Sequence, residues 1–271
     1  MGWTPGAKTL VFAHANGFPA GTYRQLFAAW QQAGWQVLAP PRLGHEPAFP
    51  VRSNWQPSRD ELIGFIEQQA PGQRVHLVGH SLGGMLSLMA ACRRPDLAAS
   101  VVMLDSPVVL GWRAGTVRLA KAVGLMDRLS PAQLSRRRRT QWPSREEARE
   151  QLGGKRLFMR WHPGVFDDYL EAGLEDAPDG GVQLAFQRDI ETAFYRTLPH
   201  QLGSMLRRHP PRCPVGFIGG TRSAEIRQAG LAGTQQVAGA RMRWIEGTHL
   251  FPMERPEETA HAVLQMLAQP G

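Results

Sequence analysis

The sequence predicts an α/β protein built on a mainly parallel sheet, and three observations support this fold class. Short aliphatic runs alternate along the chain with segments whose apolar residues recur at helical spacing. The runs show no polar–apolar alternation, so both faces of each strand are expected to be buried, as in parallel sheets. The composition, 271 residues with 42% hydrophobic and 20% charged residues, is that of an ordinary globular protein rather than a disordered or fibrous one.

The expected elements of the first part of the chain follow in order. Each strand is an aliphatic or β-branched run that ends at a turn residue such as Gly, Pro, Asn or Asp. The expected strands are residues 9–13, 36–39, 75–78 and 101–104. The helices expected between them are residues 23–32, a helix from Asp60 to the Pro71-Gly72 pair, and residues 82–92. Such units favour right-handed crossovers between parallel strands.

The alternation stops between residues 108 and 212, where the chain is expected to be mostly helical. The helices expected there are residues 116–126, 131–139, 144–160 and 189–207. Strand patterns return at residues 214–219 and 242–245, and a last helix is expected over residues 256–267. We therefore expect a core of residues 1–107 and 213–271, with a helical cap, or lid, of residues 108–212 over the carboxyl edge of the sheet.

A candidate nucleophile, Ser81, lies in the run Gly79-His80-Ser81-Leu82-Gly83-Gly84. The G-x-S-x-G pattern follows an aliphatic strand and precedes a helix, which is the context of a nucleophile elbow. Glycines are needed there because the strained turn leaves no room for side chains beside the serine. The alternatives are an incidental serine in a glycine turn and an elbow that has lost its activity.

A serine hydroxyl needs a neighbouring base, and His249 is the best candidate among the nine histidines. It lies in Gly247-Thr248-His249-Leu250-Phe251-Pro252, on a loop between the last expected strand and the last helix. A side chain on that loop could reach back to an elbow in the middle of the sheet. His14 and His80 flank turns near the same edge and are expected to be structural.

Taken in this order, the motifs resemble those of the α/β-hydrolase superfamily. The resemblance covers residues 9–109 and 214–267, and it rests on the GHSLGG elbow, an HANGFP segment similar to an oxyanion loop, and a terminal GTHLFPMERPEE similar to a histidine loop. It implies the α/β-hydrolase fold, with helices on both faces of the sheet and residues 108–212 as an inserted cap. Because few residues precede the first strand, we expect about six strands rather than a sheet with an extra opening hairpin.

The same resemblance implies an oxyanion hole made of two backbone N–H groups. One donor is Leu82, directly after the nucleophile, and the other comes from the turn of the HANGFP segment. Phe18 is the better match for the second donor and Asn16 is the alternative. The alternative is that the HANGFP segment is a plain glycine turn with no part in an oxyanion hole.

The acid that would orient His249 is not evident from the sequence. The loop after the strand at 214–219 reads Gly219-Gly220-Thr221-Arg222-Ser223-Ala224-Glu225, without the aspartate that the resemblance leads us to expect. Asp105, at the end of the strand after the elbow unit, and Glu225 are the two candidates. A dyad supported by water, or an inactive site, is the third possibility.

The resulting hypothesis is an esterase-like serine hydrolase that forms a Ser81 acyl-enzyme and uses no metal or organic cofactor. A thioesterase, a lactonase, a carbon–carbon bond hydrolase or a non-catalytic ligand-binding homologue would show the same pattern. The substrate is expected to be a small, apolar acyl compound. Apolar positions of the cap that could line its site, or simply form the core of the cap, are Val117, Leu125, Met126, Phe158, Trp161 and Phe166.

The formal net charge of +8 is the unusual feature of the composition. Its densest run, Arg136–Arg139, is best explained as a solvated helix face, with attraction of anionic substrates or of a membrane surface as the alternative. Nucleic-acid binding is not expected, because no binding motif accompanies the charges. With no long apolar run, and with Cys92 and Cys213 in no ligand pattern, we expect no stable membrane insertion, no disulfide or zinc site, and a cytoplasmic protein. The sequence does not indicate an oligomeric state.

Overall fold

The main sheet is parallel throughout, as the sequence predicts. The computed structural model describes residues 8–269, and within them this sheet has six strands in the order β2-β1-β3-β4-β8-β9. Every neighbouring pair runs parallel. The strands are β1 Thr9–Ala13, β2 Gln36–Leu38, β3 Val75–His80, β4 Ala98–Leu104, β8 Val215–Gly220 and β9 Met242–Ile245. The expected sheet of about six parallel strands is therefore confirmed.

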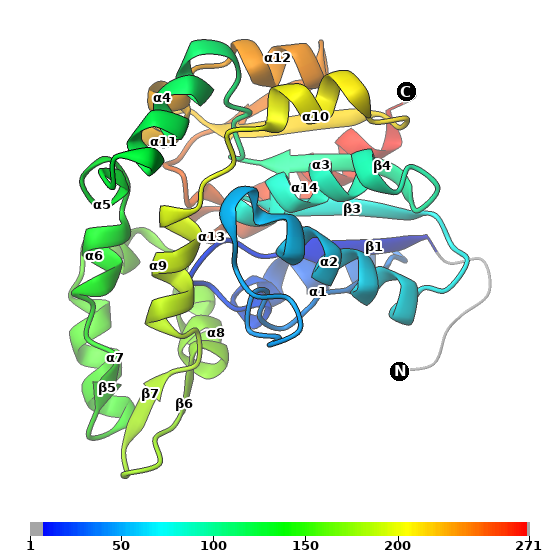
Figure 1. The fold of residues 1–271 in the computed structure, drawn as a ribbon. Coiled ribbons are helices and arrows are strands. Elements are labelled where there is room, and N and C mark those ends of the chain that lie inside the picture. The colour runs from blue at the N-terminus through cyan, green and yellow to red at the C-terminus, as the bar shows by residue number, and fades with distance from the viewer. Residues whose placement is uncertain (1–7, 270–271) are drawn as a thin grey trace.

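Helices cover both faces of the sheet (Figure 1). On one face α1 (Arg24–Gln32) packs against α14 (Pro256–Ala268), and the indole of Trp30 donates to the carbonyl of Ala260 at 3.1 Å. The other face carries α2 (Gln56–Gln69), α3 (Leu82–Arg93), α11 (Ala224–Ala229) and α12 (Ala232–Ala238). Nearly every residue of α3 is buried, which places it at the centre of this layer and fixes the strand-to-helix turn before it.

Segment 108–212 joins β4 to β8 and differs from the sequence prediction in detail. Among the described residues it contains a small antiparallel sheet, in the order β5-β7-β6, which was not expected. Strands of two or three residues are too short to show a period of two, so the sequence pattern could not predict them. The elements are α4 Gly111–Ala122, α5 Met126–Leu129, α6 Ala132–Arg136, β5 Gln141–Trp142, α7 Arg145–Gly153, η3 Phe158–Arg160, α8 Pro163–Gly173, β6 Leu174–Asp176, β7 Val182–Leu184, α9 Arg188–Arg196 and α10 Leu202–Arg208.

The helices of segment 108–212 are shorter than expected, for reasons that are local. The helix expected over residues 116–126 ends at Ala122, because Gly124 adopts φ +70°. The helix expected over 189–207 is split into α9 and α10, with Pro199 in the gap. The helix expected over 144–160 stops at the Gly153-Gly154 pair, and α8 was not predicted.

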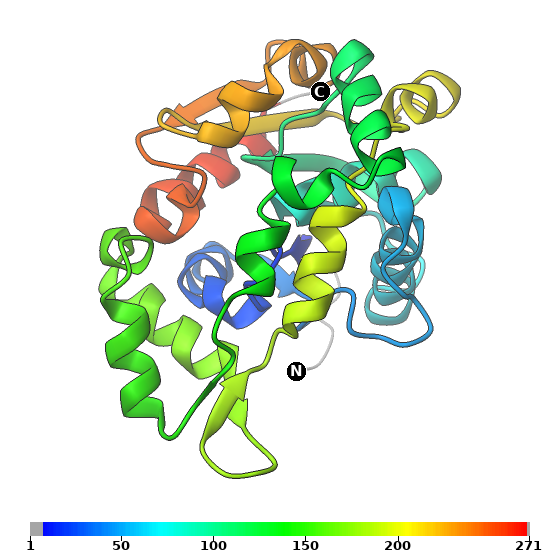
Figure 2. The ribbon, with the colours of Figure 1, turned by 60° about the vertical axis from the view of Figure 1, so that its left-hand side comes forward.

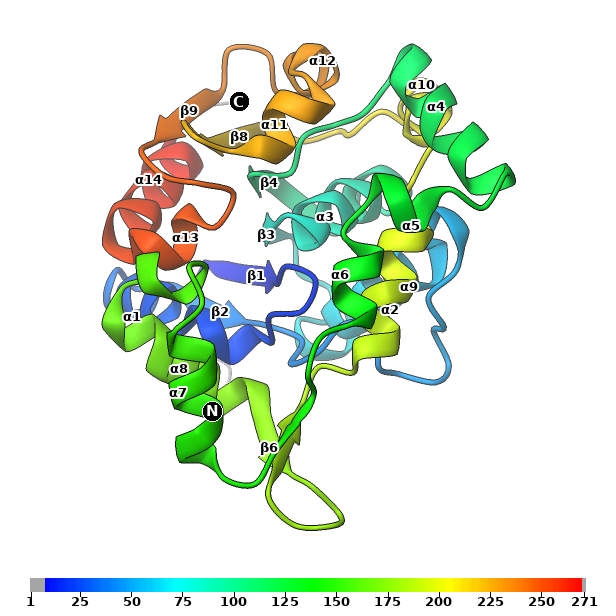
Figure 3. The ribbon, with the colours of Figure 1, turned by 90° about the vertical axis from the view of Figure 1, so that its left-hand side faces the viewer.

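Segment 108–212 lies along the carboxyl ends of the strands (Figure 3), with α6 and α9 side by side (Figure 2). Part of its core is aromatic and continues into the loop after β1. The ring of Phe18 lies 5.5 Å from that of Trp161 and 5.9 Å from that of Tyr169. Phe158 is buried in the same cluster, whereas Leu125, another expected lining residue, is exposed. The side chain of Phe18 thus anchors the segment on the core.

Three smaller elements complete the edge of the sheet that faces this segment. The 3-10 helix η1 (Ala20–Tyr23) follows the loop after β1 and contacts α8, and η2 (Ser53–Trp55) precedes α2. The short helix α13 (Phe251–Glu254) follows the loop that carries His249. Loops after β1, β3, β4, β8 and β9 therefore meet at one edge, where residues distant in the sequence come into contact. No helix within residues 8–269 has both the length and the apolar character to cross a bilayer.

Candidate active site

Ser81 occupies the strained turn between β3 and α3. Its backbone adopts φ 53° and ψ −113°, in the left-handed half of the Ramachandran plot, and its N–H donates to the carbonyl of Leu104 at 2.9 Å. The flanking glycines are sterically required. A Cβ at Gly83 would lie 2.0 Å from the carbonyl oxygen of Ala13, and one at Gly79 would lie 2.3 Å from the backbone of Gly83. The turn therefore forms only where the chain has no side chains at these two positions.

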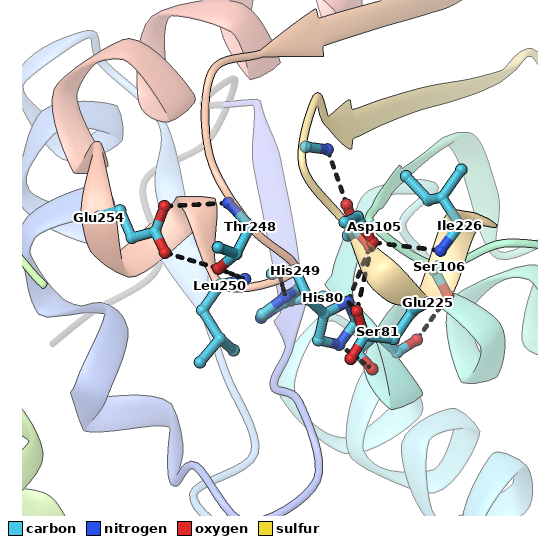
Figure 4. A network of polar contacts seen from close by, with 12 residues as sticks. His80, Ser81, Asp105, Ser106, Glu225, Ile226, Thr248, His249, Leu250 and Glu254 are labelled. Carbon is cyan, nitrogen blue, oxygen red and sulfur yellow. Dashed lines mark hydrogen bonds and ion pairs between the residues drawn. The ribbon is translucent and has the colours of Figure 1, made fainter. Parts of the chain in front are cut away.

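Hydrogen bonds connect Ser81, His249 and Asp105 (Figure 4). The hydroxyl of Ser81 lies 2.9 Å from Nε2 of His249, and Nδ1 of His249 lies 2.7 Å from Oδ1 of Asp105. In this arrangement Nδ1–H donates to the carboxylate, and Nε2 is free to accept the hydroxyl proton. The geometry is that of a nucleophile, a base and an orienting acid.

The two carboxylates considered from the sequence have different surroundings. Asp105 is fully buried, and its oxygens accept further hydrogen bonds from the Gly220 N–H at 2.7 Å and from the Ser223 hydroxyl at 2.6 Å. The side chain of Glu225 is 48% exposed, and its nearer oxygen lies 3.8 Å from Nδ1 of His249, which is beyond hydrogen-bond distance. The structure therefore brings Asp105, and not Glu225, into contact with the imidazole.

Opposing effects act on the pKa of His249. Burial disfavours the imidazolium and lowers the pKa, while the hydrogen bond and charge of Asp105, together with the charge of Glu225, raise it. The raising effects outweigh burial, so the pKa of His249 lies above its usual value of 6.5. A raised pKa makes the imidazole a stronger base toward the hydroxyl that it contacts, as long as the pH keeps the ring neutral.

His80 makes contacts that support the His249 loop. Its Nε2–H donates to the backbone carbonyl of His249 at 2.9 Å, and its Nδ1 lies 2.8 Å from the hydroxyl of Tyr23. The Ala15 N–H donates to that same hydroxyl at 3.2 Å. Burial holds the pKa of His80 well below its usual value and raises that of Tyr23, so both stay neutral. Nothing in the sequence indicated the contribution of Tyr23.

His14 is likewise engaged on both ring nitrogens. Nδ1 lies 2.9 Å from the carbonyl of Ala15, and Nε2 accepts from the Leu43 N–H at 2.7 Å. Burial lowers the pKa of His14 to about 4, so the ring is neutral near pH 7. These contacts fit the structural roles expected for His14 and His80.

The expected second oxyanion donor, Phe18, is already occupied. Its N–H donates to the carbonyl of Ala15 at 3.2 Å and closes a tight turn with Asn16 and Gly17 at its centre, Gly17 at φ +85°. Within residues 8–269 no acceptor is found for the backbone N–H of Asn16 or for that of Leu82 at the start of α3. The alternative donor from the sequence, Asn16, is therefore the better placed of the two.

The loop that carries Asn16 is held by segment 108–212. The side-chain amide of Asn16 donates to the carbonyl of Glu191 in α9 at 3.0 Å. The carboxylate of Glu191 pairs with Arg138 at 2.9 Å, and both side chains are largely buried. Arg136 and Arg139 of the same basic run pair with Asp127 and Glu147. The run is thus engaged in ion pairs at three of its positions rather than forming one solvated face.

Asp105, Glu225 and His249 also form the one group of His, Cys, Asp and Glu ligand atoms that lie within 4.8 Å of each other in the described part of the chain. Hydrogen bonds account for this proximity, because Nδ1 of His249 and both oxygens of Asp105 have protein partners. A metal there would have to displace those contacts.

Comparisons with known proteins agree with this geometry. The family model described as the alpha/beta hydrolase family matches residues 10–262. The probable esterase PIR7A of Oryza sativa is 36% identical over 103 residues, which cover 36% of this chain and 39% of that protein. The matched part therefore spans well under half the length of that relative.

Solved structures resemble the chain over nearly its whole length. The crystal structure of E-2-(acetamidomethylene)succinate hydrolase superposes with a TM-score of 0.73 at 21% identity, covering 97% of this chain and 92% of that one. A thioesterase domain from the curacin biosynthetic pathway gives a TM-score of 0.69 at 18% identity, over 96% and 92% of the two chains. At such identities the similarity establishes a shared fold.

Proposed function

Because the chain belongs to the alpha/beta hydrolase family, we propose that it is an esterase-like serine hydrolase that cleaves small acyl esters. The observation that carries the proposal is the pair of hydrogen bonds from Ser81 through His249 to Asp105. A ligand-binding homologue without catalysis would have no need to keep a buried carboxylate on the far side of the histidine. Family membership alone supports hydrolysis of a small molecule; the ester bond is our proposal.

The proposed reaction has two stages. His249 takes the proton of the Ser81 hydroxyl through Nε2 as Oγ attacks the acyl carbonyl, and it then gives that proton to the leaving alcohol. Water, deprotonated by the same nitrogen, attacks the acyl-enzyme. The bond between Oγ and the acyl carbon breaks, the acid leaves, and His249 returns the proton to Oγ of Ser81. Asp105 holds the Nδ1–H tautomer and stabilises the imidazolium.

The oxyanion would be bound by the backbone N–H groups of Leu82 and Asn16. Both are without an acceptor among the described residues; Asn16 lies on the loop after β1 and Leu82 at the start of α3, at the carboxyl edge of the sheet. Each such donor contributes about 3 kcal/mol of transition-state stabilisation in serine hydrolases. This choice replaces Phe18, whose N–H closes the turn instead.

Residues 108–212 would act as the cap over this site, on the core of residues 1–107 and 213–271. The support is their position along the carboxyl ends of the strands and the contact of Glu191 with Asn16. The apolar acyl group stays a proposal from the sequence, since Phe158 and Trp161 are packed in a hydrophobic core. We also propose a cytoplasmic location, since Cys92 and Cys213 are free thiols, as expected in a reducing compartment.

A fluorophosphonate probe tests the proposal directly. The protein should be labelled at Ser81, and Ser81→Ala should abolish labelling while the protein stays folded by circular dichroism. Lack of labelling in the folded wild-type protein would favour a non-catalytic binder.

A panel of substrates then separates the enzymatic alternatives. Oxygen esters graded by chain length, thioesters, lactones and a carbon–carbon bond substrate are compared by kcat/KM. We expect the highest values for oxygen esters. A preference for any other class by ten-fold or more would replace the esterase assignment while leaving the serine mechanism in place.

A further inference from the structure

The outer face of α4 is apolar, which is the reverse of the usual pattern for a surface helix. Trp112, Leu119 and Val123 are 72%, 64% and 57% exposed. They are separated by seven and four residues, close to two turns and one turn of helix, so they form one stripe along α4 and its C-terminal cap. We refer to these three residues as the α4 stripe.

The orientation of α4 is fixed by contacts on its other side. Ala114 and Ala120 are buried, and the ammonium of Lys121 donates to the Ser53 hydroxyl at 2.6 Å and to the Leu198 carbonyl at 3.0 Å. The polar anchor of the helix therefore points inward and the apolar residues point outward. Rotation of α4 to bury the stripe would break these hydrogen bonds.

Arginines lie beside the α4 stripe. The guanidinium of Arg113 lies 4.8 Å from the ring of Trp112. Arg118 on α4 and Arg207 on α10 line a cavity of about 530 Å³ that no carboxylate lines. Within residues 8–269, none of these three arginines has a carboxylate oxygen within 4.0 Å. A positive rim thus borders an exposed apolar strip.

We propose that α4 docks the protein onto an anionic lipid surface. A tryptophan and aliphatic residues on one face, with arginines beside them, are the properties of a helix that lies in the membrane interface. An anionic bilayer offers negatively charged headgroups to the arginines and an apolar interior to the α4 stripe. A second copy of the chain matches it less well, because two such faces would bring like charges together.

Docking through α4 is peripheral and places the candidate site on the membrane side. The helix lies beyond the carboxyl ends of the strands (Figure 1), and Ser81 and Asp105 directly follow the carboxyl ends of β3 and β4. On this basis the substrates would include acyl esters that reside in the lipid. That extension rests on the proposed function, whereas the docking itself does not.

Sedimentation with vesicles tests docking without any turnover. The wild-type protein is mixed with phosphatidylcholine vesicles that contain or lack phosphatidylglycerol. We expect binding to the anionic vesicles, weaker binding to the neutral ones, and loss of binding in high salt. The triple variant W112Q/L119Q/V123Q should lower the partition coefficient on the order of a hundred-fold, because it removes the apolar contact.

Further variants separate charge from apolar contact. R118Q and R207Q should each lower partitioning roughly five-fold on anionic vesicles and have little effect on neutral ones. Met159→Gln is the matched control, because Met159 is 70% exposed on η3, outside the α4 stripe. Should the triple variant fail to fold, Leu119→Gln alone is expected to lower partitioning several-fold.

The docking proposal and the esterase proposal can fail independently of each other. No sedimentation of the wild-type protein with anionic vesicles in low salt would overturn the docking proposal, as would equal binding by the triple variant and the wild type. A wild-type dimer in light scattering that the triple variant converts to a monomer would assign the stripe to self-association instead. None of these results depends on whether Ser81 hydrolyses an ester.

Discussion

Asp105 and Ser81 share an unusual backbone state at the ends of neighbouring strands. Their φ angles are 43° and 53°, in the region that residues with a Cβ seldom adopt. Strain of this kind persists only where surrounding contacts over-determine it, and it is concentrated at functional sites. The contacts here are the hydrogen bonds that Asp105 accepts from Gly220 and Ser223.

Substitution of the two carboxylates should have very different effects. Asp105→Asn removes the acceptor of the His249 Nδ1–H and favours the wrong tautomer, so we expect kcat to fall on the order of 10⁴-fold. Glu225→Gln should leave kcat within a few-fold of wild type, since Glu225 makes no hydrogen bond to the imidazole. Steady-state kinetics on a water-soluble ester measures both.

The pH dependence of activity in the same variants separates the orientation of His249 from the effect of nearby charge on its pKa. Because the pKa of His249 is raised, the wild-type kcat/KM should increase with pH through a midpoint above 6.5. Glu225→Gln removes one of the charges that raise this pKa and should shift the midpoint to lower pH. Comparable kcat in Asp105→Asn and Glu225→Gln would contradict the assignment of Asp105.

Sequence alone could not choose between these carboxylates. The contact between His249 and Asp105 joins residues 144 positions apart, and it depends on how two loops meet at the sheet edge. The choice between Phe18 and Asn16 is of another kind. The Asn16-Gly17 pair is a turn signal, and a tight turn centred on it uses the N–H of the next residue, so the local chemistry already disfavoured Phe18 as a donor.

At the scale of elements, the packing of α3 against β1 should tolerate no added carbon. Gly83→Ala would place its Cβ 2.0 Å from the carbonyl oxygen of Ala13, so α3 would have to shift. We expect a loss of stability of at least about 2 kcal/mol in urea unfolding, together with loss of activity because Ser81 and Leu82 move with the helix.

Gly64→Ala is the matched control for this prediction. Gly64 lies in α2, and a Cβ there would meet no atom within 4 Å. Alanine should therefore leave stability unchanged or raise it by roughly 0.5–1 kcal/mol, because it favours the helix. Equal stability of the two variants would show that the close approach of Gly83 to the backbone of β1 does not affect the free energy of unfolding.

Elements of the core could be predicted because their signals are local. The run at residues 9–13 is aliphatic and ends at turn residues, and it forms β1 with the expected bounds. Segment 108–212 was harder to predict, since most of its helices are short. Apolar residues at helical spacing usually mark the buried face of a helix, but those of the α4 stripe are exposed. Their spacing therefore could not predict which face of α4 is buried.

At the scale of the molecule, buried neutral histidines make stability depend on pH. The folded-state pKa of His14 is about 4, below the unfolded value of 6.5. The contribution of the neutral His14 ring to the free energy of unfolding is therefore complete above pH 6.5. It is lost as the pH falls toward 4, because the unfolded chain binds a proton that the native state does not bind. The loss from His14 alone is on the order of 3 kcal/mol at pH 4.

Urea unfolding between pH 7.5 and pH 4 measures this effect. His14→Gln should be less stable than wild type at pH 7.5 but should lose less stability on acidification. His209→Gln, at an exposed position, should follow the wild-type curve. If the His14 variant and the wild type lose equal stability on acidification, burial of this imidazole does not account for the acid sensitivity.

The hydrogen bond from Ser223 to Asp105 marks a second position from which a carboxylate could orient His249. The Ser223 hydroxyl lies 2.6 Å from the carboxylate that contacts His249, on the loop after β8. Exchange of the two side chains, an aspartate at 223 and a serine at 105, would keep a carboxylate and a hydroxyl facing each other across the same short distance. A carboxylate that follows β4 or one that follows β8 could therefore orient the same histidine, while Ser81 and His249 keep their places.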